Sequence, residues 1–200
     1  SLIVEVGSND GYFLKNFVAQ GIPVLGIEPA ANVAAVAQAS GIQTIVTFFG
    51  AESARQLVAA DQQADLLIAN NVLAHVPDID DFVAGLKLAL NPGGIITLEF
   101  PHLLRLMAQT QFDTIYHEHF SYLSLATAAR ILAHHGLAIF DVQELSTHGG
   151  SLRVFARHAQ ANAVAAAGAV AKVLEDERSA GLDRLDAYLK FPQKVAALKR

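Results

Sequence analysis

The stretch that decides the fold is VEVGSNDGYFL, at residues 4–14. An apolar run, LIVEV at 2–6, leads into a loop bracketed by Gly7 and Gly11, and a helical pattern follows. Glycines in such a turn allow backbone N–H groups to approach a ligand, and the N-terminus of the next helix adds partial positive charge. The stretch therefore predicts the nucleotide-binding end of an α/β sheet.

Short apolar runs alternate with helical patterns along the rest of the first half. The runs are rich in Val, Ile and Leu and nearly free of charge, which is typical of strands buried on both faces of a parallel sheet. The predicted strands are 2–6, 23–28, 42–47, 64–69 and 94–100, and the predicted helices are 10–20, 30–40, 50–60 and 78–90, the last stopped by the turn NPGG at 91–94. Alternation of this kind predicts a doubly wound α/β sheet.

Two further predicted strands, 137–145 and 151–158, follow a predicted helix at 125–135. The link between them contains THGG at 147–150, which indicates a hairpin. A terminal antiparallel hairpin on a parallel sheet is the arrangement of class I methyltransferases. We therefore predict an α/β fold with a doubly wound, mostly parallel seven-stranded sheet of the Rossmann-like methyltransferase kind.

Residues 159–200 differ from the body and are predicted to form a helical extension, or the start of a truncated C-terminal domain. Residues 1–158 would then be the cofactor-binding domain. The tail begins with an Ala-rich stretch at 161–171, continues with apolar residues at helical spacing, and is interrupted near Gly181 and ended by Phe191-Pro192. Its apolar stripe needs a partner, so we expect self-association through 170–200.

Composition excludes several classes of protein. The 200 residues are 52% hydrophobic and 16% charged, which is typical of a globular core, and the absence of cysteine excludes disulfide scaffolds, Cys-ligated zinc and thiol catalysis. A net charge of -5 argues against a nucleic-acid partner. No membrane-spanning stretch or signal sequence is recognised, so a cytoplasmic location is expected.

The loop after the first strand indicates which nucleotide is bound. An NAD fingerprint aligned on Gly7 would need glycine at Asn9 and Tyr12, whereas the observed spacing matches the S-adenosylmethionine loop of class I methyltransferases. Glu28 ends the second predicted strand, where a carboxylate can accept hydrogen bonds from both ribose hydroxyls. We therefore predict S-adenosylmethionine as cofactor and S-adenosylhomocysteine as product.

Other side chains at this end of the sheet have two interpretations each. Glu5 either contacts the amino end of the cofactor or holds the loop by hydrogen bonds. Asn70 and Asn71 either meet the methionine part or cap a helix, and Phe48 and Phe49 either flank adenine or belong to the core. The predicted cofactor-binding residues are Glu5, Gly7, Asn9, Gly11, Glu28, Phe49 and Asn71.

Histidines are concentrated in the stretch FDTIYHEHFSYLS at 112–124. His117 and His119 would lie on one side of an extended chain and could pair on a metal, with Glu118 or His102 nearby, but no further ligand follows at a fixed spacing. No metal is predicted. Imidazole is the side chain best suited to take a proton near neutral pH, and the phenol of Tyr116 could stabilise an oxyanion.

Four segments, in order, resemble the sugar C-methyltransferases. They are VEVGSNDGYFL (4–14), NNVLAHVPD (70–78), FDTIYHEHFSYLSL (112–125) and THGGSLRVF (147–155). The resemblance covers residues 1–158 and implies methyl transfer to carbon of a nucleotide-linked 4-keto-deoxysugar. The family has a cysteine-rich zinc domain before the first strand and a second α/β domain after the tail helices. We therefore expect a fragment, or a shortened relative with an incomplete sugar site.

The resemblance also implies roles for individual residues. His119 resembles the general base that removes the C3 proton beside the C4 ketone, with Tyr116 and Glu118 as its active-site neighbours. His75 resembles a histidine that lines the sugar pocket, and His148 would lie at the rim of that pocket and bind substrate. The alternatives are a small-molecule O-methyltransferase, which needs no ketone, and a non-catalytic S-adenosylmethionine-binding module in which the histidines are structural.

Overall fold

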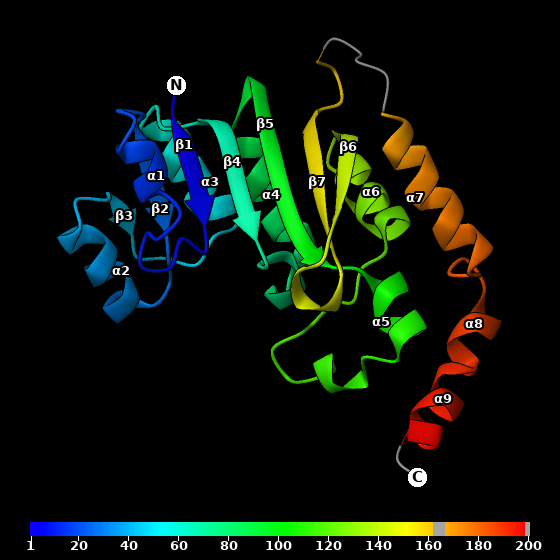
Figure 1. Cartoon of the computed structure of the whole chain (residues 1–200). Helices are drawn as coiled ribbons and strands as arrows, with labels where there is room; N and C mark the ends of the chain where they lie inside the picture. Colours follow the sequence, from blue (N-terminus) through cyan, green and yellow to red (C-terminus); the bar gives the residue numbers. More distant parts are fainter. Residues whose placement is uncertain (162–166, 199–200) are drawn as a thin grey trace.

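A computed structural model of the chain describes residues 1–161 and 167–198 (Figure 1). Within these residues one sheet has seven strands in the order β3-β2-β1-β4-β5-β7-β6. The strands are β1 (Ile3–Val6), β2 (Val24–Ile27), β3 (Thr44–Ile45), β4 (Ala64–Asn70), β5 (Leu90–Pro101), β6 (Leu137–Leu145) and β7 (Ser151–His158). The first five pair in parallel, and β7 runs antiparallel between β5 and β6. The predicted doubly wound sheet with its terminal hairpin is confirmed.

Helices cover both faces of this sheet. They are α1 (Lys15–Val18), α2 (Ala31–Ala39), α3 (Ala51–Ala59), α4 (Ile79–Ala89), α5 (Leu103–Gln109), α6 (Leu125–His134), α7 (Gly168–Ser179), α8 (Leu185–Leu189) and α9 (Phe191–Leu198). Three short 3-10 turns are η1 (Leu73–His75), η2 (Phe112–Thr114) and η3 (Thr147–Gly149). Side-chain caps start two of the helices: Asp78 accepts from the N–H of Asp81 before α4, and Ser124 accepts from that of Thr127 before α6.

The apolar core forms two layers because successive strand residues point to opposite faces. Val4 and Val6 of β1 belong to the larger cluster, which α3, α4 and α6 cover. Ile3 belongs to the smaller one, which also contains Leu14 and Ala37, after the β1 loop and in α2. The carboxyl ends of β1, β4 and β5 all point to the lower edge of the sheet in Figure 1, where the loop between α5 and α6 also lies.

Four predicted boundaries differ from those of the structure. The helix expected at 10–20 is reduced to α1, because the loop with its left-handed Asn9 and Gly11 extends to residue 14. The strand expected at 42–47 is only the two-residue β3 at the sheet edge. The NPGG turn belongs to β5, where Asn91 Nδ2 donates to Gln63 O at 3.2 Å. α8 ends at Leu189, just before Phe191-Pro192, but Pro192 lies in the first turn of α9, where its missing N–H costs nothing, so the chain continues as a further helix.

The tail divides at Gly181. Before this residue, α7 packs against β6 and α6 and buries Val170 and Val173. Beyond it, α8 and α9 lead away from the sheet (Figure 1), and Leu185 and Leu189 are 70% and 61% exposed. Only the first part of the predicted stripe is therefore covered by the body, and self-association stays a prediction. Residues 162–166 of the Ala-rich stretch lie outside the described residues.

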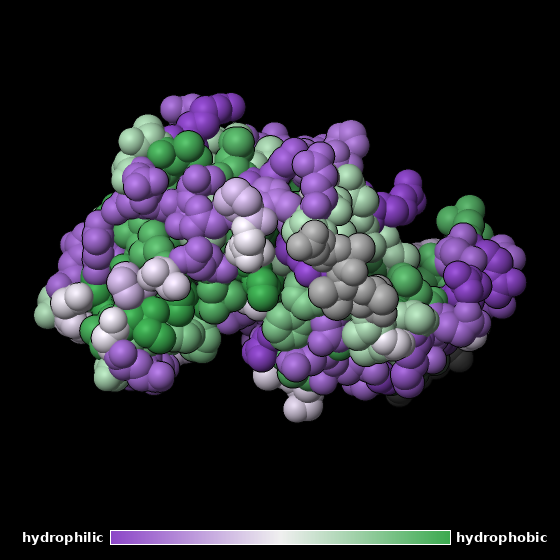
Figure 2. All heavy atoms as spheres, turned by 90° about the horizontal axis from the view of Figure 1, so that it is seen from above, coloured by the Kyte–Doolittle hydropathy of each residue, from purple (hydrophilic) through white to green (hydrophobic). Residues whose placement is uncertain are grey.

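The surface seen from above carries interspersed polar and apolar side chains (Figure 2). Scattered exposed apolar residues of this kind are normal for folded proteins. Among the helices that the structure describes, none has the length and apolar character needed to cross a bilayer.

Candidate active site

Two glycines shape the loop after β1. Gly7 has φ of +68°, and a Cβ there would lie 2.7 Å from Val72 Cγ2. Gly11 has φ of +79°, and a Cβ there would collide with the side chain of Ile42. Both positions therefore require glycine on conformational and steric grounds, as the sequence pattern indicated.

Glu28 holds this loop in place. Its side chain is 9% exposed, and its two oxygens accept the backbone N–H groups of Asn9 at 3.0 Å and Ala30 at 2.9 Å. Each carboxylate oxygen can accept a second hydrogen bond, so the contacts leave capacity for ribose hydroxyls. Asn9 contributes its backbone to this arrangement, while its own side chain accepts from the N–H of Asp10.

Glu5 lies inside the sheet with an unsatisfied oxygen. The residue is 3% exposed, Oε2 has no hydrogen-bond partner among the described residues, and burial raises the pKa of Glu5 to about 8. Buried polar atoms are almost always hydrogen-bonded, so an orphaned one is evidence of a missing polar ligand. The absence of a bond from Oε2 to the loop favours the first of the two interpretations of Glu5, contact with the amino end of the cofactor.

Two amide oxygens at the end of β4 show the same feature. Oδ1 of Asn70 and Oδ1 of Asn71 are buried, and neither has a hydrogen-bond partner in the described part of the chain. Neither oxygen therefore caps a helix, which removes that interpretation. β4 pairs with β1 in parallel, so Asn70 and Asn71 lie at the end of the strand beside the one that carries Glu5. Together the unpaired polar atoms and the glycine loop fit S-adenosylmethionine, whose amino-acid and ribose groups need such partners.

The two phenylalanines after β3 differ in their surroundings. Phe49 packs edge-on against Phe82, with ring centroids 5.5 Å apart, at the margin of the larger core. Phe48 is 83% exposed. Contact of Phe49 with adenine stays a prediction.

The loop between α5 and α6 brings three of the predicted catalytic residues together. Tyr116 Oη lies 3.2 Å from His119 Nε2, and the two rings have centroids 4.3 Å apart. The ring of His75, from η1, lies 4.7 Å from that of His119. The N–H of Phe120 donates to the carbonyl of Ala74 at 2.8 Å, which ties the loop to η1 beside His75.

Hydrogen bonds to carbonyls determine the tautomers of both histidines. His119 Nδ1 lies 2.8 Å from the Thr114 carbonyl, and His75 Nδ1 lies 2.9 Å from the Glu118 carbonyl. Because a carbonyl oxygen only accepts, each Nδ1 carries a hydrogen and each neutral ring keeps its lone pair on Nε2. His119 Nε2 therefore accepts from the phenol of Tyr116 and carries a lone pair that could take a proton.

The remaining predicted residues contribute less directly. Glu118 is exposed, and the contact it makes within this cluster comes from its backbone carbonyl rather than its carboxylate. His148 is exposed in η3 with φ of +52°. The neighbouring Gly149 carbonyl accepts from Gln111 Nε2 at 2.8 Å, so the hairpin turn contacts the start of the loop between α5 and α6. Tyr122, which the sequence did not single out as a site residue, adds an aromatic wall, its ring 5.8 Å from that of His119.

A candidate metal-binding cluster among the described residues lies away from the loop between α5 and α6. Asp80, His134 and His135 place one ligand atom each within 4.8 Å of one another, on α4 and α6. Neither His117 nor His119 belongs to this group. The structure therefore gives no support to the metal pair considered for 117–119.

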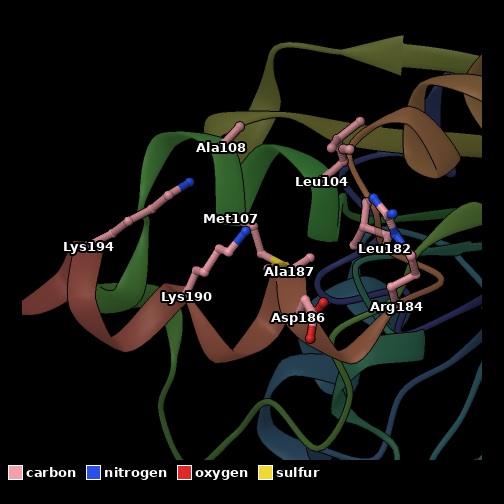
Figure 3. A pocket seen from close by; sticks show the side chains of 10 residues that line it. Leu104, Met107, Ala108, Leu182, Arg184, Asp186, Ala187, Lys190 and Lys194 are labelled. Atoms are coloured by element: carbon pink, nitrogen blue, oxygen red, sulfur yellow. The ribbon is translucent and has the colours of Figure 1, made fainter.

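A groove of about 370 Å³ separates α5 from the last two helices (Figure 3). Leu104 and Met107 contribute apolar side chains from α5, and Arg184, Lys190 and Lys194 contribute cationic ones from the tail. The residues predicted to bind cofactor or act in catalysis are not among those that line it. A smaller cavity on α5 contains Leu103 and Leu106 together with Thr114 and His119.

Comparison with protein families divides the chain into two matches. Residues 2–142 match a family described as a methyltransferase domain, and residues 146–200 match one described as a C-methyltransferase C-terminal domain. The first match alone covers more than half of the chain.

Among curated proteins, the C-methyltransferase NovU of Streptomyces niveus is 40% identical over 190 residues, which are 95% of this chain and 45% of that protein. A ubiquinone biosynthesis O-methyltransferase of Methylobacterium sp. (strain 4-46) is 30% identical over 94 residues, which are 46% of this chain and 38% of that protein. The chain thus spans less than half of the length of these relatives.

Solved structures share the fold at low identity. The PH0226 protein from Pyrococcus horikoshii OT3 has a TM-score of 0.63 and 13% identity, covering 78% of this chain and 81% of that one. Magnesium protoporphyrin IX methyltransferase from Synechocystis PCC 6803 with bound S-adenosylmethionine has a TM-score of 0.57 and 17% identity, covering 78% and 68%. With the family match, the glycine loop and the seven-stranded sheet, these findings show that the chain belongs to the S-adenosylmethionine-dependent methyltransferase family.

Proposed function

We propose that the protein transfers a methyl group from S-adenosylmethionine to a ring carbon of a nucleotide-linked 4-keto-deoxysugar. Two findings support methylation of carbon. Residues 146–200 match a C-methyltransferase C-terminal domain, and a C-methyltransferase is 40% identical over 95% of the chain. The keto-sugar follows from the resemblance of the four motifs and from the chemistry of the histidine cluster.

The observation that carries the proposal is the lone pair on Nε2 of His119, which accepts from the Tyr116 phenol at 3.2 Å. A saturated carbon becomes a nucleophile only after a proton leaves it, and a neighbouring ketone makes this possible by taking the charge as an enolate. A base and an acidic hydroxyl side by side meet both needs. Methylation of a hydroxyl would need the base alone.

The residues act in a defined order in this mechanism. The substrate ketone accepts the Tyr116 hydrogen bond, which frees the lone pair on His119 Nε2. His119 then takes the proton from the carbon next to the ketone, and the electrons of that C–H bond form the enolate. Nδ1 stays bonded to the Thr114 carbonyl at 2.8 Å and keeps the ring aligned while it is charged. His75 keeps its hydrogen on Nδ1, bonded to the Glu118 carbonyl, so in this tautomer it would line the sugar pocket rather than donate to the oxyanion.

The residues described above would hold the cofactor. Glu28 would bind the ribose, the 7–11 loop the adenosine end, and Glu5 with Asn71 the amino-acid end. When bound, S-adenosylmethionine supplies a methyl group on a positively charged sulfur, which a carbon nucleophile takes as S-adenosylhomocysteine is released. Fixing both reactants in one geometry would account for much of the rate.

The test compares His119→Asn with His117→Asn. Both change a histidine of the same loop, but His117 is exposed, whereas His119 lies in the cluster. We expect His119→Asn to lower methyl transfer to a nucleoside-diphosphate-linked 4-keto-6-deoxyhexose by about 10²–10⁴-fold, the usual contribution of a general base. His117→Asn should retain the rate, and both variants should bind S-adenosylhomocysteine as the wild type does.

Transfer at the wild-type rate by His119→Asn would refute the role of this residue. Methyl found on oxygen would favour the O-methyltransferase alternative. Cofactor binding without transfer to any keto-sugar would favour the binding module.

A further inference from the structure

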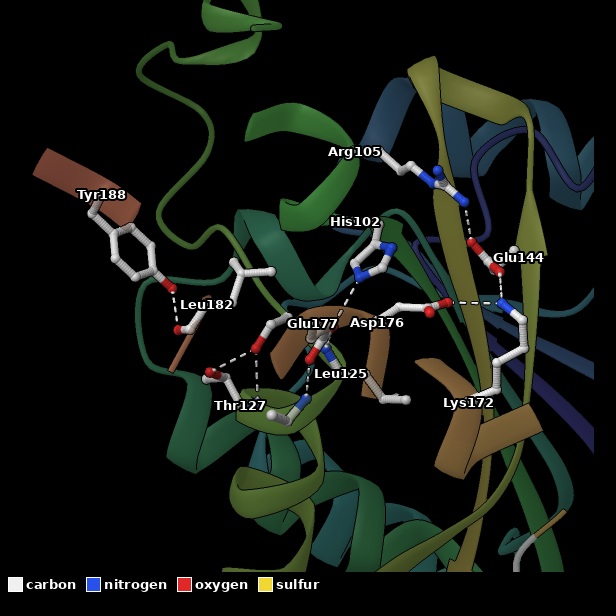
Figure 4. Close-up of polar contacts among 12 residues, drawn as sticks. His102, Arg105, Leu125, Thr127, Glu144, Lys172, Asp176, Glu177, Leu182 and Tyr188 are labelled. Carbon is white, nitrogen blue, oxygen red and sulfur yellow. Dashed lines mark hydrogen bonds and ion pairs between the residues drawn. The ribbon is translucent and has the colours of Figure 1, made fainter. Parts of the chain in front are cut away.

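A buried carboxylate of the tail, Glu177 on α7, contacts two separate segments of the body (Figure 4). The residue is 2% exposed, and its Oε1 lies 2.8 Å from Nε2 of His102. Oε1 also accepts the N–H of Leu125 at 2.5 Å, and Oε2 accepts that of Ala126 at 3.0 Å. A carboxylate survives burial only when donors of this kind replace water, so the placement of Glu177 is specific.

These two segments are the ends of the loop that carries the catalytic cluster. His102 immediately precedes α5, while Leu125 and Ala126 begin α6, and Tyr116 and His119 lie on the chain between the two helices. Directly beside Glu177, the N–H of Leu103 donates to the carbonyl of Leu123 at 3.0 Å. The loop is therefore closed at its base, and Glu177 is the side chain that bridges both sides of the closure.

Glu177 also supplies caps that α6 lacks by itself. Ser124 bonds the N–H of Thr127, which leaves the N–H groups of Leu125 and Ala126 without an intrahelical partner. The Glu177 carboxylate takes both, and its charge lies at the positive end of the helix dipole. Removal of the carboxylate would leave the N–H groups of Leu125 and Ala126 without this partner, while the Ser124 cap on Thr127 would remain.

His102 depends on Glu177 for its side-chain partner. Because the carboxylate accepts, Nε2 of His102 donates, and Nδ1 is buried without a partner among the described residues. The backbone N–H of His102 donates to the carbonyl of Gly150 at 3.0 Å, which adds the β6–β7 turn to the same junction. His102 thus links the tail, α5 and the hairpin turn.

The contacts around His102 and Glu177 extend to His119 through α5. Leu103 and Leu106, in the first turn of this helix, line the small cavity that also contains Thr114 and His119. The Thr114 carbonyl is the partner of His119 Nδ1. A shift at the start of α5 would therefore move the wall against which the catalytic ring is held.

Another polar contact between α7 and the body, made by Lys172, is exposed. Lys172 lies 3.9 Å from Glu144, which Arg105 contacts at 2.6 Å, and these three side chains are 66%, 35% and 45% exposed. Exposed ion pairs of this kind contribute little to stability. Among the contacts of α7 shown in Figure 4, the buried Glu177 is the one that can fix geometry.

We propose that Glu177 is a positioning residue, which orders the active-site loop by holding its two ends, so that α7 works as part of the methyltransferase unit. The expected effect of Glu177 on the rate of methyl transfer rests on the proposed function, whereas its expected effect on the order of the loop does not.

The experiment compares Glu177→Gln with Glu175→Gln, a carboxylate of the same helix that is exposed and paired with Arg178. Amide hydrogen exchange is measured over 103–126 and over β1 to β4, together with S-adenosylhomocysteine affinity and methyl transfer to the keto-sugar. Loss of a charge-assisted bond predicts at least about tenfold faster exchange in the loop and α6. Glu177→Gln should also lower kcat, with unchanged exchange in β1 to β4 and unchanged cofactor affinity, while Glu175→Gln should match the wild type.

Unchanged loop exchange in Glu177→Gln would overturn the proposal, as would acceleration spread equally over the whole sheet, since that would indicate a general loss of stability. If Glu177→Gln does not fold, His102→Gln decides the question: it should loosen 103–111 while α6 stays protected, and no change there would equally overturn the inference. A wild-type protein that methylates no keto-sugar would refute the proposed function, and the exchange result would still decide the role of Glu177.

Discussion

Replacement of Glu5 by Gln tests the predicted cofactor site. Burial of the Glu5 carboxyl group in the folded chain disfavours its ionised form. Burial raises the pKa of Glu5 from 4.5 to about 8. The folded chain therefore keeps this proton between these two pH values, while the unfolded chain loses it. The contribution of Glu5 to stability is fully present below pH 4.5 and is lost as the pH rises toward 8.

The magnitude follows from the same two values. The whole shift from 4.5 to about 8 corresponds to roughly 5 kcal/mol. Between pH 5 and pH 8, the wild type should lose roughly 3 kcal/mol of unfolding free energy relative to Glu5→Gln, since the amide carries no titrating proton. Denaturant unfolding of both proteins at the two pH values measures this difference directly.

The cofactor provides the second measurement. If the ammonium group of S-adenosylhomocysteine approaches Glu5, binding near pH 7 ionises the carboxyl and releases a proton to the buffer. The calorimetric binding enthalpy of the wild type should then depend on the ionisation enthalpy of the buffer, and that of Glu5→Gln should not. Equal pH dependence of stability in the two proteins would refute the buried-carboxyl argument, and equal buffer dependence would refute the contact with the cofactor.

Two further predictions concern the loop and the tail. Gly11→Ala should lower the free energy of unfolding by about 2–4 kcal/mol and abolish S-adenosylhomocysteine binding, because a positive φ and a collision with Ile42 combine. The control is Gly21→Ala, where φ is +72° and no atom lies within 4 Å of the new Cβ. This variant should lower the free energy of unfolding by only about 1 kcal/mol. The exposed Leu185 and Leu189 predict concentration-dependent association in sedimentation that a double change to Ser removes, and a wild type that stays monomeric at all concentrations would contradict this.

The parts of the fold that local sequence signals define were predictable. Gly7 and Gly11 mark a turn that only glycine can make, and the Gly-rich link at 147–150 marks the hairpin. Boundaries failed where distant contacts decide them. Asn91 joins β5 rather than a turn because it bonds Gln63 and Asp65, 28 and 26 residues away.

The candidate site shows the same division. Residues close in sequence, such as Tyr116 and His119, could be grouped from the chemistry of one short stretch, and His75 could be added only through the resemblance. No local signal joins His102 to Glu177, which are 75 residues apart and lie in segments of different composition. The roles of backbone groups, such as the Thr114 carbonyl that sets the tautomer of His119, are invisible without coordinates.

The position of the transferred methyl group distinguishes methylation of carbon from methylation of oxygen. The protein is incubated with S-[methyl-¹³C]adenosylmethionine and a nucleoside-diphosphate-linked 4-keto-6-deoxyhexose, and the product is analysed by carbon NMR. We expect a labelled methyl bonded to the ring carbon next to the ketone, with loss of one hydrogen from that carbon. A labelled methyl on oxygen, with every ring hydrogen retained, would contradict it.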